Sequence, residues 1–182
     1  MKSLFLSLFL LLFISSFGLV KTASAQTYAT SEAKLIKVNY TLPWPGILPD
    51  NPLYILKAIR DNVINFFITD PLKKSEYDLL MSDKRLVSAK MLVDKGEYQL
   101  AITTLSKAGN YFDEAIGLAS TAKQQGEDTS SLLDKLYRAS QKHQQVIYDM
   151  EQKTTGGIKY NLELLQVRAK NFQDTVSVMK SQ

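Results

Sequence analysis

The chain has 182 residues, with 22 Lys and Arg against 18 Asp and Glu, a single histidine and no cysteine. The lack of cysteine excludes cysteine nucleophiles, thiolate metal sites, c-type haem attachment and lipidation of an N-terminal cysteine. The formal net charge is +4, but Lys2 and Lys21 contribute to it and no block of five like charges occurs. The composition therefore gives little support to nucleic-acid binding.

The beginning of the chain predicts a signal peptide over residues 1–25. A basic start at Lys2 is followed by the almost wholly apolar residues 4–20, and the sequence ASA before Gln26 has the small residues that signal peptidase requires. We expect cleavage there and an extracytoplasmic protein, secreted or on the cell surface. The apolar run is close to the lower limit for crossing a bilayer, about 17 residues, so a retained membrane anchor is the alternative.

Residues 26–50 are predicted to be an extended leader that ends in the proline-rich stretch PWPGILPDNPLY. Pro45-Gly46 suits a type II turn, because proline fits its second residue and glycine accepts the positive φ of its third. We interpret the stretch as a rigid clasp against the helices, with Trp44 and Tyr54 as candidates to face a partner. The alternative is a proline-rich ligand for an aromatic-lined groove.

From residue 51 onward the pattern predicts five helices separated by short breaks. Asn51-Pro52 and Asp70-Pro71 each combine a good N-cap with a proline at the first helical position. Glycines at 96, 126 and 156–157 mark the ends of three helices. The predicted helices span 52–69, 71–95, 97–125, 129–153 and from 158 almost to the C-terminus.

The four longer predicted helices have the 3-4-3-4 apolar spacing of helices that pack on one another. The helix over 129–153 shows it most simply, at Leu132, Leu136, Ala139, His143, Val146 and Met150. Short connections favour antiparallel neighbours, so we predict an all-α domain over 51–182. Its architecture is an up-and-down bundle of four long helices plus a shorter N-terminal helix. The alternative is two stacked helical hairpins, suggested by KGEYQLAITTLSKA, although no second copy of that segment occurs at a fixed period.

The predicted helix over 52–69 has apolar residues around most of its circumference. In one interpretation it lies across the bundle and is buried on a wide face. In the other it is an interfacial helix, with residues 66–68 in a membrane and Lys57 and Arg60 at the lipid headgroups.

The segment YTLPWPGILPDNPLYILKAIRD, residues 40–61, resembles the signature of a bacterial family classified as a domain of unknown function. Its members carry a pattern like LPYPGxLPDxPLYxLKxxRD after a signal peptide. The resemblance extends over residues 40–120 and covers the last two helices only loosely. Trp44 stands where Tyr is commoner, and Asn51 where Asp, Ser or His is commoner. The resemblance implies an extracytoplasmic helical domain and supplies no activity, cofactor or catalytic residue.

Arg60, Asp61, Asp83 and Arg85 form the most suggestive polar set, since LKxxRD and DKRL recur as units in the family pattern. We predict that the first helix docks on the second through an Arg60–Asp83 ion pair, with Lys57 or Arg85 beside it. Such pairs fix orientation more than they stabilise. No nucleophile or base accompanies them, so we predict no catalytic site.

His143 lies on the apolar side of its helix, and we interpret it as a core histidine satisfied by one partner. The alternative is a metal ligand. The Glu-x-x-His motif of di-iron bundles is absent from the sequence, and no carboxylate lies at a helical ligand spacing from His143. We therefore expect neither a metal nor another cofactor.

Together these patterns predict a non-enzymatic binding or structural module of the cell envelope, whose partner is an unknown envelope protein or peptide. The alternative is a membrane-peripheral module anchored by the helix over 52–69 or by an uncleaved signal segment. Nucleic acid is not expected as a partner, and the sequence does not fix the oligomeric state. The candidate structural or partner-facing residues are Trp44, Pro45, Gly46, Pro52, Tyr54, Lys57, Arg60, Asp61, Asp83 and Arg85.

Overall fold

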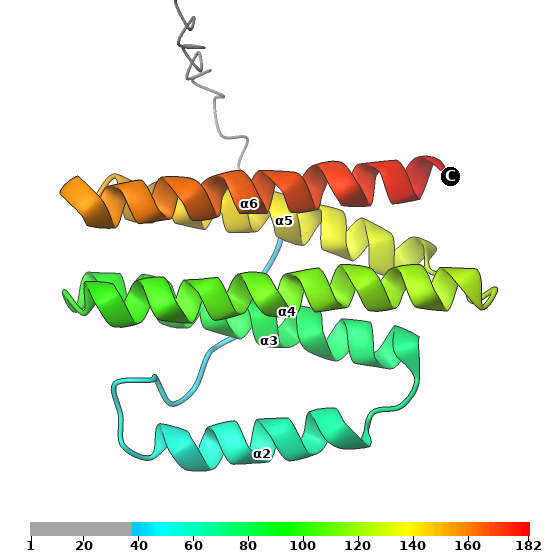
Figure 1. Ribbon diagram of the computed structural model, residues 1–182, viewed down its shortest axis with the longest axis horizontal. Coiled ribbons are helices and arrows are strands. Elements are labelled where there is room, and N and C mark those ends of the chain that lie inside the picture. Colours follow the sequence, from blue (N-terminus) through cyan, green and yellow to red (C-terminus); the bar gives the residue numbers. More distant parts are fainter. Residues whose placement is uncertain (1–37) are drawn as a thin grey trace, which may run out of the picture. The chain divides into compact units, whose positions relative to one another are not determined.

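The computed structural model describes residues 38–182, and the predicted signal peptide and most of the leader lie outside the described residues. Five helices make up most of this part of the chain, which contains no strand (Figure 1). They are α2 (Tyr54–Phe67), α3 (Pro71–Asp94), α4 (Tyr98–Gln124), α5 (Ser130–Glu151) and α6 (Gly156–Ser181). The predicted all-α class is confirmed.

Helices α3 to α6 form a bundle, and each helix runs opposite to the one before it (Figure 1). α3 packs most extensively on α4, and α5 on α6, while α4 contacts α6 and α3 contacts α5 between these two pairs. α4 and α5 barely touch, although a short loop joins them. The four-helix bundle is confirmed, but its helices are paired as two stacked hairpins, the arrangement that the sequence offered as the alternative. The contacts between the hairpins consequently join parallel helices.

The helix starts follow local hydrogen bonding. Asp70 accepts a hydrogen bond from the Lys73 amide at 2.8 Å, which caps α3 as predicted. α2 begins two residues later than predicted, because the Asn51 side chain accepts from the Leu53 amide at 2.9 Å and residues 51–53 form a turn. α6 begins at Gly156, so the break before it lies at residues 152–155 and not at the glycines.

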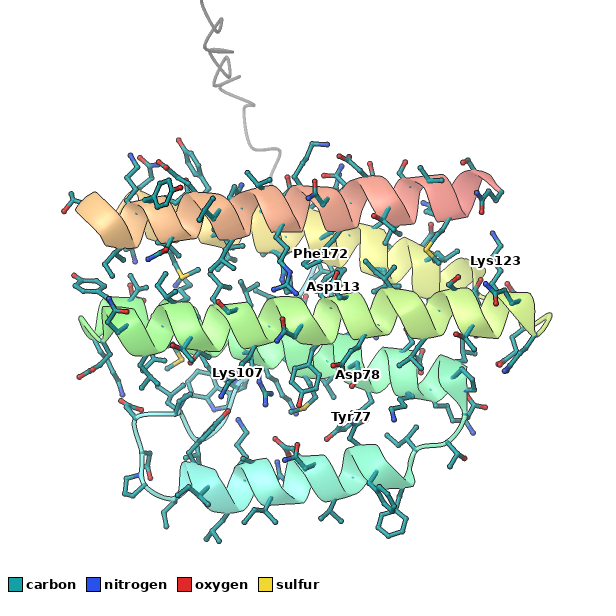
Figure 2. All side chains as sticks on the ribbon, viewed as in Figure 1. Tyr77, Asp78, Lys107, Asp113, Lys123 and Phe172 are labelled. Carbon is teal, nitrogen blue, oxygen red and sulfur yellow. The ribbon has the colours of Figure 1, made fainter. Side chains whose placement is uncertain are left out.

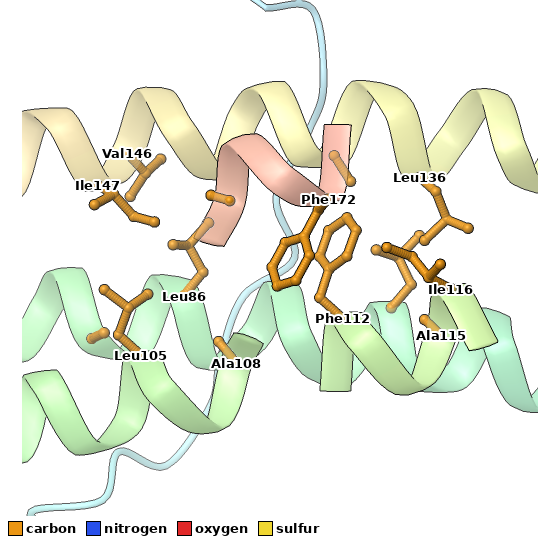
Figure 3. Close-up of a cluster of buried hydrophobic side chains, with 14 of the residues drawn as sticks. Leu86, Leu105, Ala108, Phe112, Ala115, Ile116, Leu136, Val146, Ile147 and Phe172 are labelled. Carbon is orange, nitrogen blue, oxygen red and sulfur yellow. The ribbon is translucent and has the colours of Figure 1, made fainter. Parts of the chain in front are cut away.

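The core lies between the two hairpins and is centred on aromatic rings. Phe112 of α4 and Phe172 of α6 stack with their centroids 4.6 Å apart, and Phe112 also meets the edge of His143 at 5.0 Å (Figure 3). All six apolar-side residues predicted for α5 are buried. Tyr98, at the start of α4, is exposed.

The α3–α4 hairpin is close because its facing side chains are small. α4 presents alanines to α3, and two serines of α3 donate hydrogen bonds to the α4 backbone. Ser75 donates to the carbonyl of Ala115 at 2.6 Å, and Ser82 donates to that of Ala108 at 2.8 Å. These bonds satisfy buried hydroxyls and fix the register of the two helices.

Candidate interaction surface

Helix α2 turns its polar side toward the bundle. Asp61 is its one buried residue, and the half-buried Tyr54, Lys57 and Asn65 follow the same side at spacings of three and four. The helix runs alongside α3 but makes no close helix–helix packing with α3 to α6 (Figure 1). α2 is thus attached to the domain without contributing to its core.

The opposite side of α2 is apolar and exposed. We call it the outer stripe and define it by six side chains that are each 50–79% exposed: Ile55, Leu56, Ile59, Val63, Phe66 and Phe67. At 100° per residue they fall within a sector of about 120° of the helix circumference. Exposed apolar surfaces of this extent on soluble domains mark interaction sites. None of the helices in residues 38–182 combines the length and hydrophobicity needed to cross a bilayer.

Polar contacts hold α2 in place. The Tyr77 hydroxyl of α3 donates to the Asp61 backbone carbonyl at 3.0 Å. The Lys57 ammonium donates to the backbone carbonyls of Pro45 at 2.6 Å and Ile47 at 3.2 Å, and its partial burial lowers its pKa. Arg60 pairs with the neighbouring Asp61 at 2.7 Å and is itself exposed. Hydrogen bonds of this kind orient the helix while leaving its apolar residues outside.

The proline-rich clasp is divided between buried and exposed residues. Pro45 and Leu48 are buried, and Gly46 adopts the φ of +72° that a type II turn places at its third residue. Asp50 binds Lys95 at the end of α3, with 2.6 Å between the charged atoms. Trp44 is 73% exposed, so it gives the bundle little apolar cover.

Two of the candidate residues flank the start of α2. Pro52 is exposed in the turn before the helix. Tyr54 is half-buried, with the Lys57 ammonium 5.4 Å from its ring centroid. The clasp and the first turn of α2 are therefore joined through Lys57.

Asp83 belongs to a different part of the structure, and the predicted Arg60–Asp83 ion pair is wrong. One Asp83 oxygen accepts from the Tyr40 hydroxyl at 2.6 Å, and the other lies 2.8 Å from Nε2 of His143. Asp83 and Tyr77 are six residues apart, about 240° around the helix, so Asp83 faces α5 while Tyr77 faces α2. The pair forms no bridge because α2 and Asp83 lie on different sides of α3.

The interpretation of His143 as a core histidine with one partner is confirmed. His143 and Asp83 are both almost fully buried, and the cavity beside His143 is only about 10 Å³, room for at most one water molecule. Burial and the Asp83 carboxylate raise the pKa of Tyr40. Through its hydrogen bond to Asp83, Tyr40 attaches the segment before the clasp to the bundle, a role that the sequence did not reveal.

Arg85 of α3 and Tyr111 of α4 form a second contact between these helices. The guanidinium lies over the Tyr111 ring, 4.4 Å from its centroid. Arg85 therefore does not complete a site with Arg60 and Asp61, as the sequence units had suggested.

Asp78 is the most unusual polar residue of the domain. It is fully buried, and neither carboxylate oxygen has a hydrogen-bond partner among the described residues. Burial and the nearby Glu114 raise its pKa to about 6. Figure 2 marks it beside Tyr77 on α3. No group of three or more His, Asp and Glu in residues 38–182 is placed to hold a metal ion.

The outer stripe is the feature that sequence analysis missed. The apolar residues of the segment were noted, but the side they would face was left open. A signal was present in the Tyr54, Lys57, Asp61 and Asn65 series, because a helix with a continuous polar line has one face suited to polar contacts.

Comparison with protein families shows that one family model covers helices α2 to α5 and most of the clasp. The model of a domain of unknown function, DUF5667, matches residues 46–157, more than half of the chain, from the clasp to the start of α6. The match extends through α5, which the sequence resemblance covered only loosely, and it begins after Pro45. No curated protein and no solved structure matches the chain.

Proposed function

We propose that this chain, which belongs to the DUF5667 family of domains of unknown function, is an exported, non-catalytic module of the cell envelope that binds a partner through helix α2. The observation that carries the proposal is the outer stripe. Export is proposed from the sequence of residues 1–25, which predicts a cleaved signal peptide.

The outer stripe supports a binding role because the bundle does not need it. No α2 side chain belongs to the hydrophobic core of α3 to α6, and Asp61, the one buried residue of α2, is polar. Leaving large apolar side chains in water forgoes about 1.5–3 kcal/mol for each one that could be buried. A partner that covers the stripe removes this exposure.

The candidate residues Asp83 and Lys57 support a non-catalytic role because their charged groups are already bound within the chain. Asp83 is shared between Tyr40 and His143, and Lys57 binds backbone carbonyls. A catalytic nucleophile needs a base within hydrogen-bond reach and an opening for substrate. Within residues 38–182 the cavity beside the one buried histidine–carboxylate pair has room for at most one water molecule, too little for a substrate. We assign the clasp prolines and Gly46 a structural role in presenting α2.

A protein surface suits the outer stripe better than a lipid surface. Membrane-surface helices have basic residues on their polar face, where they meet the headgroups. In α2 that face is turned to the bundle, and Lys57 is bound to the clasp. Arg60 is exposed but already paired with Asp61. The membrane-peripheral alternative therefore lacks free basic residues on α2 that would bind the lipid headgroups.

The binding role is tested by capture from envelope extracts. The bait is protein purified from cells that express the full-length chain, compared with Ile59→Asp in the outer stripe. The matched control is Leu164→Asp on α6, whose side chain has a similar exposure. We expect wild type and Leu164→Asp to retain the same envelope component and Ile59→Asp to lose it. Equal capture by all three proteins would contradict the role of α2.

Export is tested separately by determining the N-terminus of the protein recovered from the extracytoplasmic fraction. We expect Gln26 as the first residue. Recovery only from the cytoplasm, with Met1 or Lys2 first, would overturn the proposed location.

A further inference from the structure

We infer that the outer stripe binds a second copy of this chain, through antiparallel pairing of the two α2 helices. The inference rests on the proposed binding role of α2. Leu56, Ile59, Val63 and Phe66 follow the 3-4-3 spacing of a helix–helix seam, and Ile55 and Phe67 flank it on either side. This spacing favours another helix over a flat surface as the occupant.

The outer stripe is symmetric about Asp61, as pairing with an identical helix requires. A two-fold axis there places Leu56 opposite Phe66 of the second copy and Ile59 opposite its Val63. Ile55 likewise comes level with Phe67 of the second copy, across the seam. An interface between identical copies related by a two-fold axis must be self-complementary in this way. Each aromatic ring then packs against an aliphatic side chain of the second copy, and the Phe66–Phe67 pairs of the two copies lie at opposite ends of the contact.

The charges near the outer stripe permit this pairing. No stripe residue is charged, and the same axis brings Arg60 of each copy to the same side of the seam, where each guanidinium is paired with its own Asp61. Arg60 keeps its own partner, Asp61, at 2.7 Å. Burying an unpaired charge costs several kcal/mol, and the contact would bury none.

The size and position of the outer stripe also fit a dimer. Its six side chains expose on the order of 800 Å², which equals one side of a standard protein–protein interface. α2 lies at the edge of the molecule, away from the α5–α6 hairpin (Figure 1). Two copies can therefore bring their α2 helices together without the bundles colliding. Another exposed apolar group, Tyr160, Leu164 and Val167 on α6, is about half as large.

Sedimentation equilibrium tests the inference on protein purified from cells that express the full-length chain. We expect a reversible monomer–dimer equilibrium for wild type. Ile59→Asp should weaken it at least about tenfold, because an aspartate in the seam must be desolvated against apolar side chains. Leu164→Asp should dimerise like wild type. Both positions are exposed in the monomer, so circular dichroism and melting temperature should be unchanged in either variant at concentrations where wild type is monomeric.

Three results would overturn the inference. The first is a wild-type protein that stays monomeric up to millimolar concentration, and the second is a dimer that Ile59→Asp does not weaken. The third is binding of the monomer to phosphatidylethanolamine–phosphatidylglycerol vesicles that Ile59→Asp abolishes, because the stripe would then be occupied by lipid. If wild type is monomeric but its envelope capture still depends on Ile59, self-pairing fails while the proposed binding role stands.

Discussion

Helices α5 and α2 are both amphipathic, but they orient their apolar sides in opposite directions. The apolar side of α5 is buried against α3 and α6, and its polar side faces water. α2 meets the bundle with Tyr54, Lys57 and Asp61 and leaves its apolar side in solvent. An apolar stripe therefore indicates that a face is covered, but it does not indicate what covers it. For α5 the cover is the rest of the chain, and for α2 we propose that it is another molecule.

The two regions should also differ in stability. α5 belongs to a core in which side chains from four helices interlock, whereas α2 is held by a few hydrogen bonds. Regions with few buried apolar contacts open at lower free energy than the core. Mutations in the bundle should therefore change folding, and mutations in the outer stripe should change binding.

The largest effect is expected from Phe112→Ala in the core. The substitution removes the ring that stacks on Phe172 and meets the edge of His143. It should lower the free energy of unfolding by about 3–5 kcal/mol, measured by urea denaturation. A loss below about 1 kcal/mol would mean that this core is not packed as described.

Asp83→Ala should be the next most destabilising change, by about 2–4 kcal/mol, because it leaves the buried Tyr40 hydroxyl and His143 without their shared partner. Tyr40→Phe removes one of the two bonds and should lower the free energy of unfolding by only about 1 kcal/mol. Hydrogen exchange should show loss of protection around residues 38–42 in both variants. Faster exchange confined to α2 would instead revive a link between Asp83 and that helix.

Asp78 predicts a pH dependence of stability. Its pKa is about 6 in the folded protein, against an ordinary value of 3.8. Between these pH values the folded state binds more protons than the unfolded state, so the free energy of unfolding should fall as pH rises from about 4 to 6 and then level off. Asp78→Asn should remove this fall and raise stability at pH 7 by about 1–3 kcal/mol, because a neutral amide is easier to bury than a carboxylate. Urea denaturation at pH 4, 5, 6 and 7 measures both effects. An unchanged slope in the variant would mean that Asp78 is solvated.

The smallest effect on folding is expected from Phe66→Ala in the outer stripe. Its side chain is 79% exposed, so the free energy of unfolding of the monomer should change by less than about 0.5 kcal/mol. The substitution is chemically identical to Phe112→Ala, which makes the two variants a matched pair. A loss above about 2 kcal/mol for Phe66→Ala at concentrations where the protein is monomeric would show that α2 packs on the bundle.

Much of the fold could be predicted from the sequence because local signals and apolar spacing agree. Asp70-Pro71 set the start of α3, and the seam of α5 was identified residue by residue. The pairing of the helices could not be predicted, since alternating directions are compatible with more than one arrangement of four helices. Close contact between α3 and α4 depends on small alanines and on serines whose hydroxyls bond to the α4 backbone. Such serine hydrogen bonds leave little periodic signal in the sequence.

Candidate residues whose role depends on their chain neighbours were predicted well, and those whose partners lie far away in the sequence were not. Gly46 has the positive φ that its residue type and its place after Pro45 predicted. Asp83 finds its partners 43 and 60 residues away, so no short sequence unit could identify Tyr40 and His143. DKRL suggested a contact with α2 because Arg60 and Asp83 have complementary charges, but the angular position of Asp83 on α3 excluded it.

Disulfide trapping tests the pairing of the outer stripes most directly, because the chain contains no cysteine of its own. Ile59→Cys and Val63→Cys proteins of different tag length are mixed and oxidised, with Leu164→Cys as the control. Antiparallel pairing about Asp61 predicts that the mixed dimer, which joins one Ile59→Cys chain to one Val63→Cys chain, forms well above its share under random pairing, while Leu164→Cys stays monomeric. Cross-linking no greater than that of Leu164→Cys would contradict the pairing, and so would mixed and same-variant dimers in random proportion.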